Sequence, residues 1–328
     1  SDPFTIEKID DLSIDEMVED TKQRKRRLYQ KEIEKDEKPF EYFVERLEEP
    51  TIEVSRVETV KEPEQSLDWG IVAPFADVHL GARSVQSDME LEDQVEIIKE
   101  MTKETLNRMV SSSRGNPSHI KLLFLGDFFH VDNSKETTWY GTELETCSDH
   151  DRIIHRGYDL ILTIIDMCTQ IADTEVVLCK GNHDRDMTVS LAAHLKAIRD
   201  QMQFTFTPRI LNGIYAERQY TVYENSIIAG THQRHESLKD LDSIMMREAG
   251  NLISQTDHHY FFGADKHTEM MKGDYPSGMK FYRNAKLGPL DPFEDRHGYY
   301  ARSGLRWFGF DPQHGIVSTE TCWLSEVR

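Results

Sequence analysis

The chain has 328 residues, 38% of them hydrophobic, which is enough for one core of about 250 residues with an accessory segment, or for two ordinary domains. No apolar run approaches the roughly 18 residues of a membrane span and no charged-then-apolar leader opens the chain, so no membrane association is expected. The formal charge is 39 minus 59, or −20; it argues against a protein that simply coats nucleic acid, although bound divalent metals can invert the field locally.

The four cysteines are scattered and form no C-x-x-C pair, so neither a thiol zinc site nor a disulfide framework is predicted. They are Cys147, Cys168, Cys179 and Cys322. A reducing, cytoplasmic location fits this pattern best. We interpret residues 1–5 as a remnant of an expression vector.

Residues 6–66 are about half charged and poor in glycine, so this N-terminal extension (1–66 with the remnant) cannot bury a core alone. Apolar positions recur at helical spacing and predict short amphipathic helices. Two interpretations of this extension remain open. Its helices are simply solvated, or the extension acts as a basic arm that contacts nucleic acid or a partner. The candidate nucleic-acid-binding residues of such an arm are Arg24, Lys25, Arg26 and Arg27.

From Trp69 onward, short apolar runs alternate with longer amphipathic stretches, a pattern typical of a layered α/β domain. A catalytic domain is therefore predicted over 67–328. The pattern predicts strands over 70–77, 119–127, 174–181 and 257–267, helices over 91–110, 151–172, 187–199 and 238–253, and hairpin-like strands within 218–230. Short strands over 279–328 are expected to complete a second sheet.

Five of the predicted strands end in side chains that bind hard metals. They are Asp77 and His79, Asp127 and His130, Asn182 with His183 and Asp184, His232 and His235, and Asp265 and His267. Any one cluster alone is more simply a turn former or a structural histidine. Ligands at the carboxyl ends of neighbouring strands converge on one crevice, and five such ends in succession are hard to attribute to chance.

In this order the motifs ADVH, GDFFH, GNHD, GTHQRH and GADKH resemble the calcineurin-like metallophosphoesterases. The resemblance covers about residues 70–310. GDFFH is similar to the corresponding motif of SbcD-type DNA-repair exonucleases, and the stretch 280–315 resembles metallophosphoesterases carried by phages and prophages. The resemblance implies an α/β fold, a four-layer α/β/β/α sandwich that holds two divalent metals. SbcD-type enzymes also work with an ATPase partner, so such a partner is a further expectation.

The resemblance also assigns the ligands. Asp77, His79 and His267 would hold the first metal, Asn182 and His232 the second, and Asp127 would bridge them. Such ligands suit Mn, Fe or Zn, and a shared carboxylate would hold two ions about 4 Å apart. A bridging hydroxide is then the expected nucleophile.

Three further residues are assigned to catalysis. His183 follows a predicted ligand and is placed to orient the substrate or protonate its leaving group, with Asp184 expected to fix the tautomer of His183. His130 is a second candidate, facing the phosphate.

One residue departs from the family pattern, because Asp265 stands where the family has a histidine ligand of the second metal. Direct ligation by this harder group would favour Mn, or Mg, over Zn. A weakened second site and a misaligned register are the alternatives.

Three functions remain open at this stage. The first is a metal-dependent phosphodiesterase or nuclease acting on DNA or RNA. The second is a small-molecule phosphoesterase (a cyclic or dinucleotide phosphodiesterase, or a phosphomonoesterase), which the acidic charge favours. The third is a catalytically degenerate binding module. The sequence does not determine an oligomeric state.

Overall fold

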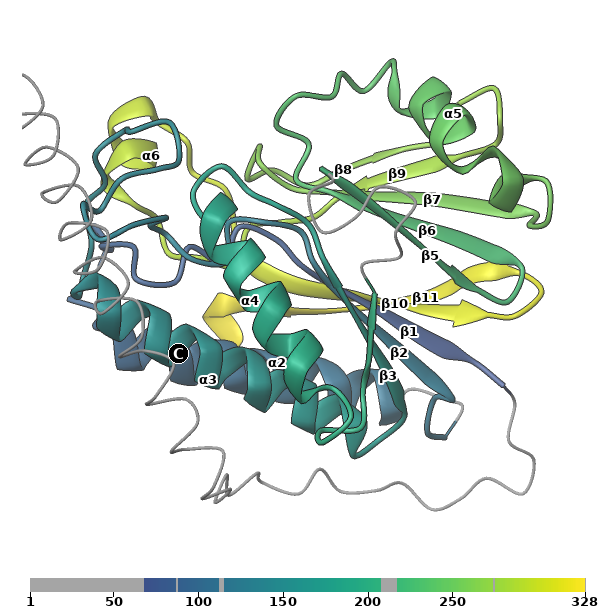
Figure 1. The fold of residues 1–328 in the computed structure, drawn as a ribbon, viewed down its shortest axis with the longest axis horizontal. Coiled ribbons are helices and arrows are strands. Elements are labelled where there is room, and N and C mark those ends of the chain that lie inside the picture. The colour runs from purple at the N-terminus through teal and green to yellow at the C-terminus, as the bar shows by residue number, and fades with distance from the viewer. Residues whose placement is uncertain (1–67, 87, 112–114, 208–216, 274, 328) are drawn as a thin grey trace, which may run out of the picture. The chain divides into compact units, whose positions relative to one another are not determined.

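Two β-sheets form the centre of the described chain (Figure 1). The computed structural model describes residues 68–327 except 87, 112–114, 208–216 and 274, all within one unit of the chain, 54–328. The first sheet has the order β11 (Gly315–Trp323), β10 (Gly304–Asp311), β1 (Gly70–Phe75), β2 (His119–Phe124), β3 (Asp173–Leu178) and β4 (Thr205–Thr207). The second has the order β5 (Arg218–Tyr223), β6 (Ser226–Thr231), β7 (His258–Gly263), β9 (Lys280–Arg283) and β8 (Met270–Lys272).

Helices cover the outer face of each sheet (Figure 1). The first sheet carries α2 (Leu91–Ser111), α3 (His150–Thr169) and α4 (Arg185–Ile198), and the second carries α5 (Leu241–Ile253). A short helix, α6 (Pro292–His297), and a 3₁₀ turn (Leu324–Glu326) complete the described elements. The predicted α/β/β/α sandwich is therefore confirmed. Among the described helices, none is long and apolar enough to cross a membrane.

Among the described residues, one apolar cluster lies between the two sheets and another lies between the second sheet and α5. Val72, Leu123 and Val177 of the first sheet pack against Ile228 and Phe262 of the second, which is the core between the sheets. The outer face of the second sheet packs on α5, with Phe261 and Phe281 against Leu241 and Met245. This alternation along each strand is what a sheet buried on both faces requires.

Two of the described helices, α3 and α6, begin at aspartates whose side chains cap them. Asp149 caps α3 by accepting a hydrogen bond from the Arg152 backbone N–H. In α6, Asp291 and Glu294 form a reciprocal capping box, and Gly298 ends the helix with φ of 71°. α2 buries an apolar stripe that includes Val95, Ile98 and Met101, as its helical spacing predicts.

The prediction that residues 279–328 complete the second sheet is wrong in part. β9 does join the second sheet, but β10 pairs antiparallel with β1 and extends the first sheet, and β11 follows it. Strand periodicity indicates which face of a strand is buried and does not indicate which sheet it joins. The short helix α6 was also not predicted.

The predicted extension over 1–66 lies outside the described residues, and so do Arg24, Lys25, Arg26 and Arg27. Their proposed contact with nucleic acid stays a prediction, and so does the domain boundary between residues 66 and 67.

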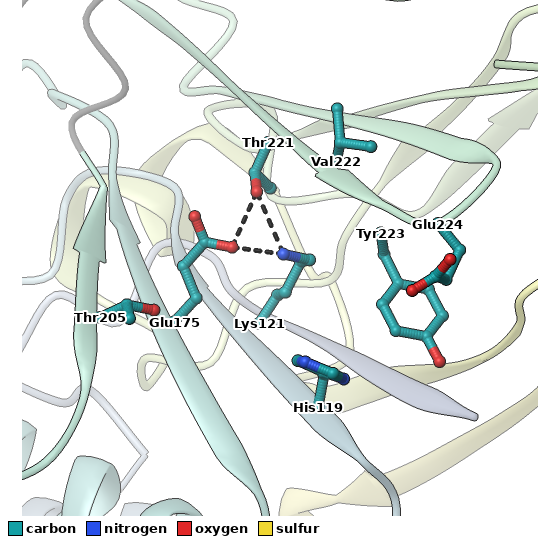
Figure 2. A pocket seen from close by; sticks show the side chains of 8 residues that line it. All are labelled: His119, Lys121, Glu175, Thr205, Thr221, Val222, Tyr223 and Glu224. Carbon is teal, nitrogen blue, oxygen red and sulfur yellow. Dashed lines mark hydrogen bonds and ion pairs between the residues drawn. The ribbon is translucent and has the colours of Figure 1, made fainter. Parts of the chain in front are cut away.

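A cavity of about 320 Å³ lies near the amino ends of β2 and β3 (Figure 2). Lys121 of β2 forms an ion pair there with Glu175 of β3. Thr221 of β5 accepts a hydrogen bond from Lys121 Nζ (3.1 Å) and donates one to Glu175 Oε2 (2.8 Å). This polar link joins the two sheets at the end of the strands that lies opposite the predicted metal ligands.

A second ion-pair network connects α5 to the second sheet. Arg218 of β5 donates to the Glu248 carboxylate from Nε, which is 3.2 and 3.0 Å from the two oxygens, and from Nη2 at 2.7 Å. Tyr220 Oη donates a further hydrogen bond at 2.8 Å. Burial by itself would raise the pKa of Glu248. The hydrogen bonds from Arg218 and Tyr220 outweigh this effect, so the pKa is lower than its usual 4.5.

We expect Glu248→Gln to lower the free energy of unfolding by about 1 to 3 kcal/mol at pH 7, because hydrogen bonds to a charged group are lost. The folded-state pKa is the lower one, so this stabilisation is present above pH 4.5 and is lost as pH falls through the folded pKa. Urea unfolding at pH 7 and at a pH below the folded-state pKa of Glu248 measures it. Glu96→Gln, at a carboxylate 63% exposed, is the control, and a difference that persists at low pH would contradict the prediction.

Candidate metal centre

The predicted ligands lie together at the carboxyl ends of five strands. Asp77 and His79 follow β1, Asp127 follows β2, Asn182 follows β3, His232 follows β6, and Asp265 and His267 follow β7. Among the described residues, three groups of potential ligands have their donor atoms within 4.8 Å of one another. They are Asp77, His79 and His267; Asp77, Asp127 and His232; and His79, His130 and His183. The structure therefore brings all the predicted ligand-bearing loops to one place.

The backbone of these loops is unusual. Nine non-glycine residues among those described have positive φ, and five of them are predicted ligands: Asp77, His79, Asp127, Asp265 and His267, with φ between 45° and 68°. Left-handed backbone is costly for such residues and concentrates at functional sites. These residues lie two to four positions beyond the ends of β1, β2 and β7, where the left-handed backbone helps to aim their side chains at the centre.

Glycines allow two of the loops to meet. A Cβ on Gly181 would lie 1.9 Å from Asp127 Oδ1 and 2.2 Å from the Asp127 backbone nitrogen. No side chain can occupy that position without displacing the predicted bridging carboxylate. The loop contact is completed by the backbone N–H of His183, which donates to Asp127 Oδ1 at 2.8 Å.

Asp127 lies between two sets of ligands. Its Oδ2 is 3.9 Å from His79 Nε2 on one side and 3.1 Å from His232 Nε2 on the other. His79 Nε2 is in turn 3.3 Å from His267 Nε2, and His232 Nε2 is 3.1 Å from Asn182 Oδ1. This arrangement suits a carboxylate shared by two ions, as the resemblance implies.

Neighbouring groups orient two of the imidazoles. His232 Nδ1 donates to the Leu125 carbonyl at 3.1 Å, and His267 Nδ1 donates to Glu294 Oε1 at 2.6 Å. Because both acceptors take the Nδ1 proton, each ring presents Nε2 to the centre as the ligating nitrogen. The fixed tautomers match the ligand roles predicted for both residues.

The charge balance also fits a cation. Burial alone would lower the pKa of His232, but Asp127, Asp77 and Asp265 together raise it to about 10. Burial, followed by the charge of His183, lowers the pKa of His79 well below 6.5 and so favours a neutral, ligating ring. Three converging carboxylates with side chains at most 4% exposed make a strongly negative pocket. The donor set and its charge thus fit divalent metals.

Asp265 reaches the centre but is also held by cations. Its Oδ1 is 3.7 Å from His232 Nε2 and 3.3 Å from Arg234 Nη1, and its Oδ2 is 2.5 Å from Lys266 Nζ. Its backbone N–H donates to both carboxylate oxygens of Asp77. Its direct ligation of a metal stays a proposal.

The expectation that Asp184 fixes the tautomer of His183 is wrong. The His183 Nδ1 donates instead to the His130 backbone carbonyl at 2.8 Å. Asp184 is 1% exposed and accepts backbone N–H groups of Asp127, Phe128, Phe129 and Gly181. Burial and then the Asp127 charge raise the pKa of Asp184 to about 7. Its carboxyl group therefore connects the loop that carries Asp127 to the loop that carries Asn182.

His130 is more enclosed than a group that faces substrate. It is 3% exposed, its Nδ1 lies 3.4 Å from His79 Nδ1, and its ring stacks on His183 with centroids 5.3 Å apart. Burial, followed by the charge of His183, lowers the pKa of His130 to about 3. A role of His130 at the phosphate stays a prediction, whereas His183 is half-buried and better placed to reach a ligand.

Sequence reasoning missed the residues that support the ligands from outside. Glu294 binds His267, and Lys286 binds Glu294 in an ion pair where both side chains are 1% exposed. The sequence Asp291-Pro292-Phe293-Glu294 is a recognisable helix start, but nothing in it indicates a contact with His267, 27 residues earlier.

Comparison with known proteins gives only distant likenesses. No family model and no curated protein matches the sequence. The structure is similar to Vps29 from Entamoeba histolytica complexed with Zn²⁺ (13% identity, TM-score 0.34, covering 77% of this chain and 99% of that one). It is also similar to a predicted phosphoesterase from Streptococcus pneumoniae TIGR4 (10% identity, TM-score 0.27, covering 78% and 98%). At these scores the functional conclusion depends on the site itself.

Proposed function

We propose that this chain is a divalent-metal-dependent phosphoesterase, and that its substrate is a phosphodiester of DNA or RNA. The observation that carries the proposal is the convergence of three aspartates, three histidines and Asn182 at five strand ends, around Asp127. Two ions held by this set would neutralise charge on the phosphate oxygens and activate the attacking water. Mn is favoured, because Asp265 adds a hard oxygen donor; Mg, Fe and Zn are the alternatives.

The chain's own residues supply the other requirements of phosphodiester cleavage. His183 donates its Nδ1 proton to the His130 carbonyl, so it can pass a second proton from Nε2 to the departing oxygen when the ring is protonated on both nitrogens. Arg234 and Lys266 are about half exposed and place positive charge at the rim, where a phosphate would arrive. A nucleic-acid substrate is also supported by the GDFFH motif and its resemblance to SbcD-type nucleases. Because those nucleases work with an ATPase partner, the same proposal includes an ATPase partner for this chain.

The net charge of −20 favours one alternative, a small-molecule phosphoesterase, because no extended polyanion must then be accommodated. A degenerate binding module is the remaining alternative, supported by the cations that engage Asp265.

Substrate and metal panels separate these functions. The protein is treated with EDTA, supplied with Mn, Mg, Fe or Zn, and assayed on end-labelled single- and double-stranded DNA and RNA, on bis-p-nitrophenyl phosphate and on p-nitrophenyl phosphate. We expect cleavage of the oligonucleotides and the diester that disappears in EDTA and returns best with Mn. A preference for the monoester would favour a phosphomonoesterase, and no turnover with any metal would favour the binding module.

A further inference from the structure

Two large aromatic side chains stand exposed beside the candidate metal centre. Trp139 is 47% exposed and Tyr140 is 54% exposed, in the segment between β2 and α3. Their rings meet edge to face, with centroids 5.0 Å apart and an interplanar angle of 86°. Aromatic rings of this size are usually buried to a large extent, so an exposed pair at a site indicates a contact with a ligand.

Hydrogen bonds fix this pair to the loops that carry predicted ligands. The Trp139 backbone N–H donates to the Asn182 carbonyl at 3.1 Å, and a 3.3 Å hydrogen bond joins Tyr140 Oη and His235 Nε2. His235 follows His232 by three residues. The rings therefore lie on the side of the centre formed by Asn182 and His232.

The turn that presents the rings is itself well ordered by its hydrogen bonds. The Gly141 N–H donates to the Thr138 carbonyl at 2.8 Å, and the Thr138 N–H donates to the Thr142 carbonyl at 2.9 Å. Gly141 has φ of 84°, a conformation that glycine adopts without strain. A rigid presentation lowers the entropy lost when a flat ligand stacks.

Cationic side chains lie near the pair even though the chain is acidic. The Arg185 guanidinium lies 5.0 Å from the centroid of the Trp139 ring and also pairs with Glu217. Arg234 and Lys266 pair with Asp265 at the candidate metal centre. Planar rings with cations next to a phosphate site are the combination that binds a nucleotide, with a base on the ring and its phosphate on the cations.

We propose that Trp139 and Tyr140 form a stacking site for the nucleobase next to the scissile phosphate. The bases of a duplex are already stacked on both faces, so the preferred substrate is an unpaired nucleotide, in a single strand or at a frayed end. Recognition by stacking needs no extended cationic surface and so is compatible with a net charge of −20. This inference rests on the proposed phosphodiesterase function.

The test compares a single-stranded thymidine oligonucleotide with a matched oligonucleotide of abasic residues, which has the same backbone charge and no bases. For Trp139→Ala we expect kcat/KM on the thymidine substrate to fall about 5- to 100-fold, the range for loss of one stacked base. Cleavage of the abasic substrate should stay unchanged. Trp139→Phe should recover most of the loss, and Tyr140→Ala should show a smaller loss of the same kind.

A binding measurement without turnover provides a second readout. Fluorescence anisotropy of the two oligonucleotides, labelled far from the reacting end and measured in EDTA, should show a base-dependent affinity that Trp139→Ala removes. Met246→Ala is the control, because Met246 is 48% exposed and lies on α5. Wild-type protein that cleaves both oligonucleotides equally, or a Trp139→Ala loss that is equal on both, would overturn the stacking site. Failure of the wild type to cleave either oligonucleotide or bis-p-nitrophenyl phosphate would instead overturn the proposed function.

Discussion

Asp127→Asn is expected to remove phosphodiester cleavage. Loss of a group that only hydrogen-bonds to a metal ligand typically lowers activity roughly 10- to 100-fold, and the loss of activity in this variant should be larger. The asparagine keeps an oxygen for the His183 N–H, which now bonds Asp127 Oδ1 at 2.8 Å. It loses the negative charge that lies between His79 and His232. Because both proposed ions would share this carboxylate, one substitution should impair both sites.

Metal binding gives this prediction a readout that is independent of turnover. Titration calorimetry with Mn should show weaker binding by Asp127→Asn, and the rise in melting temperature that Mn gives the wild type should shrink. A melting temperature in EDTA close to that of the wild type would show that the fold is intact. Wild-type affinity and activity in the variant would contradict the shared-ligand role.

Asp132→Asn is the matched control for Asp127→Asn. Asp132 lies five residues further along the same segment and is 6% exposed, but its Oδ1 accepts backbone N–H groups of Asp186 and Met187 at the start of α4. An asparagine oxygen can accept the same hydrogen bonds. We therefore expect Asp132→Asn to retain Mn affinity and cleavage.

The sequence predicts most of the fold because its apolar runs are long and regular. The helix expected over 91–110 is α2, Leu91–Ser111, and the strand expected over 119–127 is β2, His119–Phe124. The predicted strands extend too far only at the metal motifs. Asp77, Asp127 and Asp265 were assigned to strands, but their positive φ takes them out of the ladder. These aspartates lie two or three residues beyond the ends of β1, β2 and β7.

The residues that hold the metal-binding loops and ligands in place could not be predicted, because their roles depend on contacts between segments distant in sequence. Asp184 is next to His183 in sequence, yet its carboxylate binds backbone groups of residues 127–129. Trp139 carries no motif, and its relevance depends on the hydrogen bond to Asn182, 43 residues later. Short-range patterns identify candidate ligands, whereas the side chains that orient them are set by tertiary packing.

Lys286→Met is expected to lower the free energy of unfolding by about 3 to 5 kcal/mol, the range for breaking a buried ion pair by removing one partner. Lys286 and Glu294 form an ion pair with both side chains 1% exposed. Lys286 Nζ also donates to the Pro289 carbonyl at 2.8 Å. Methionine fills the same space but leaves the Glu294 charge with His267 as its remaining ionic partner.

Urea unfolding in EDTA, followed by tryptophan fluorescence, measures this effect without any metal contribution. The control is Lys99→Met, because Lys99 pairs with Glu96 at the surface, where the carboxylate is 63% exposed and the pair should contribute about 1 kcal/mol or less. A loss in Lys286→Met no larger than in Lys99→Met would show that the pair does not stabilise the fold.

The double variant Lys286→Met with Glu294→Gln should lose less stability than the two single variants added together, since neither charge is then left buried alone. Glu294→Gln separates support of the fold from support of the centre, because the amide keeps the side-chain shape but holds the His267 Nδ1 proton less strongly. We expect its Mn affinity to fall about 10- to 100-fold, with Lys99→Met unchanged. If Glu294→Gln weakens the fold but binds Mn like the wild type, Glu294 supports the fold and does not orient His267.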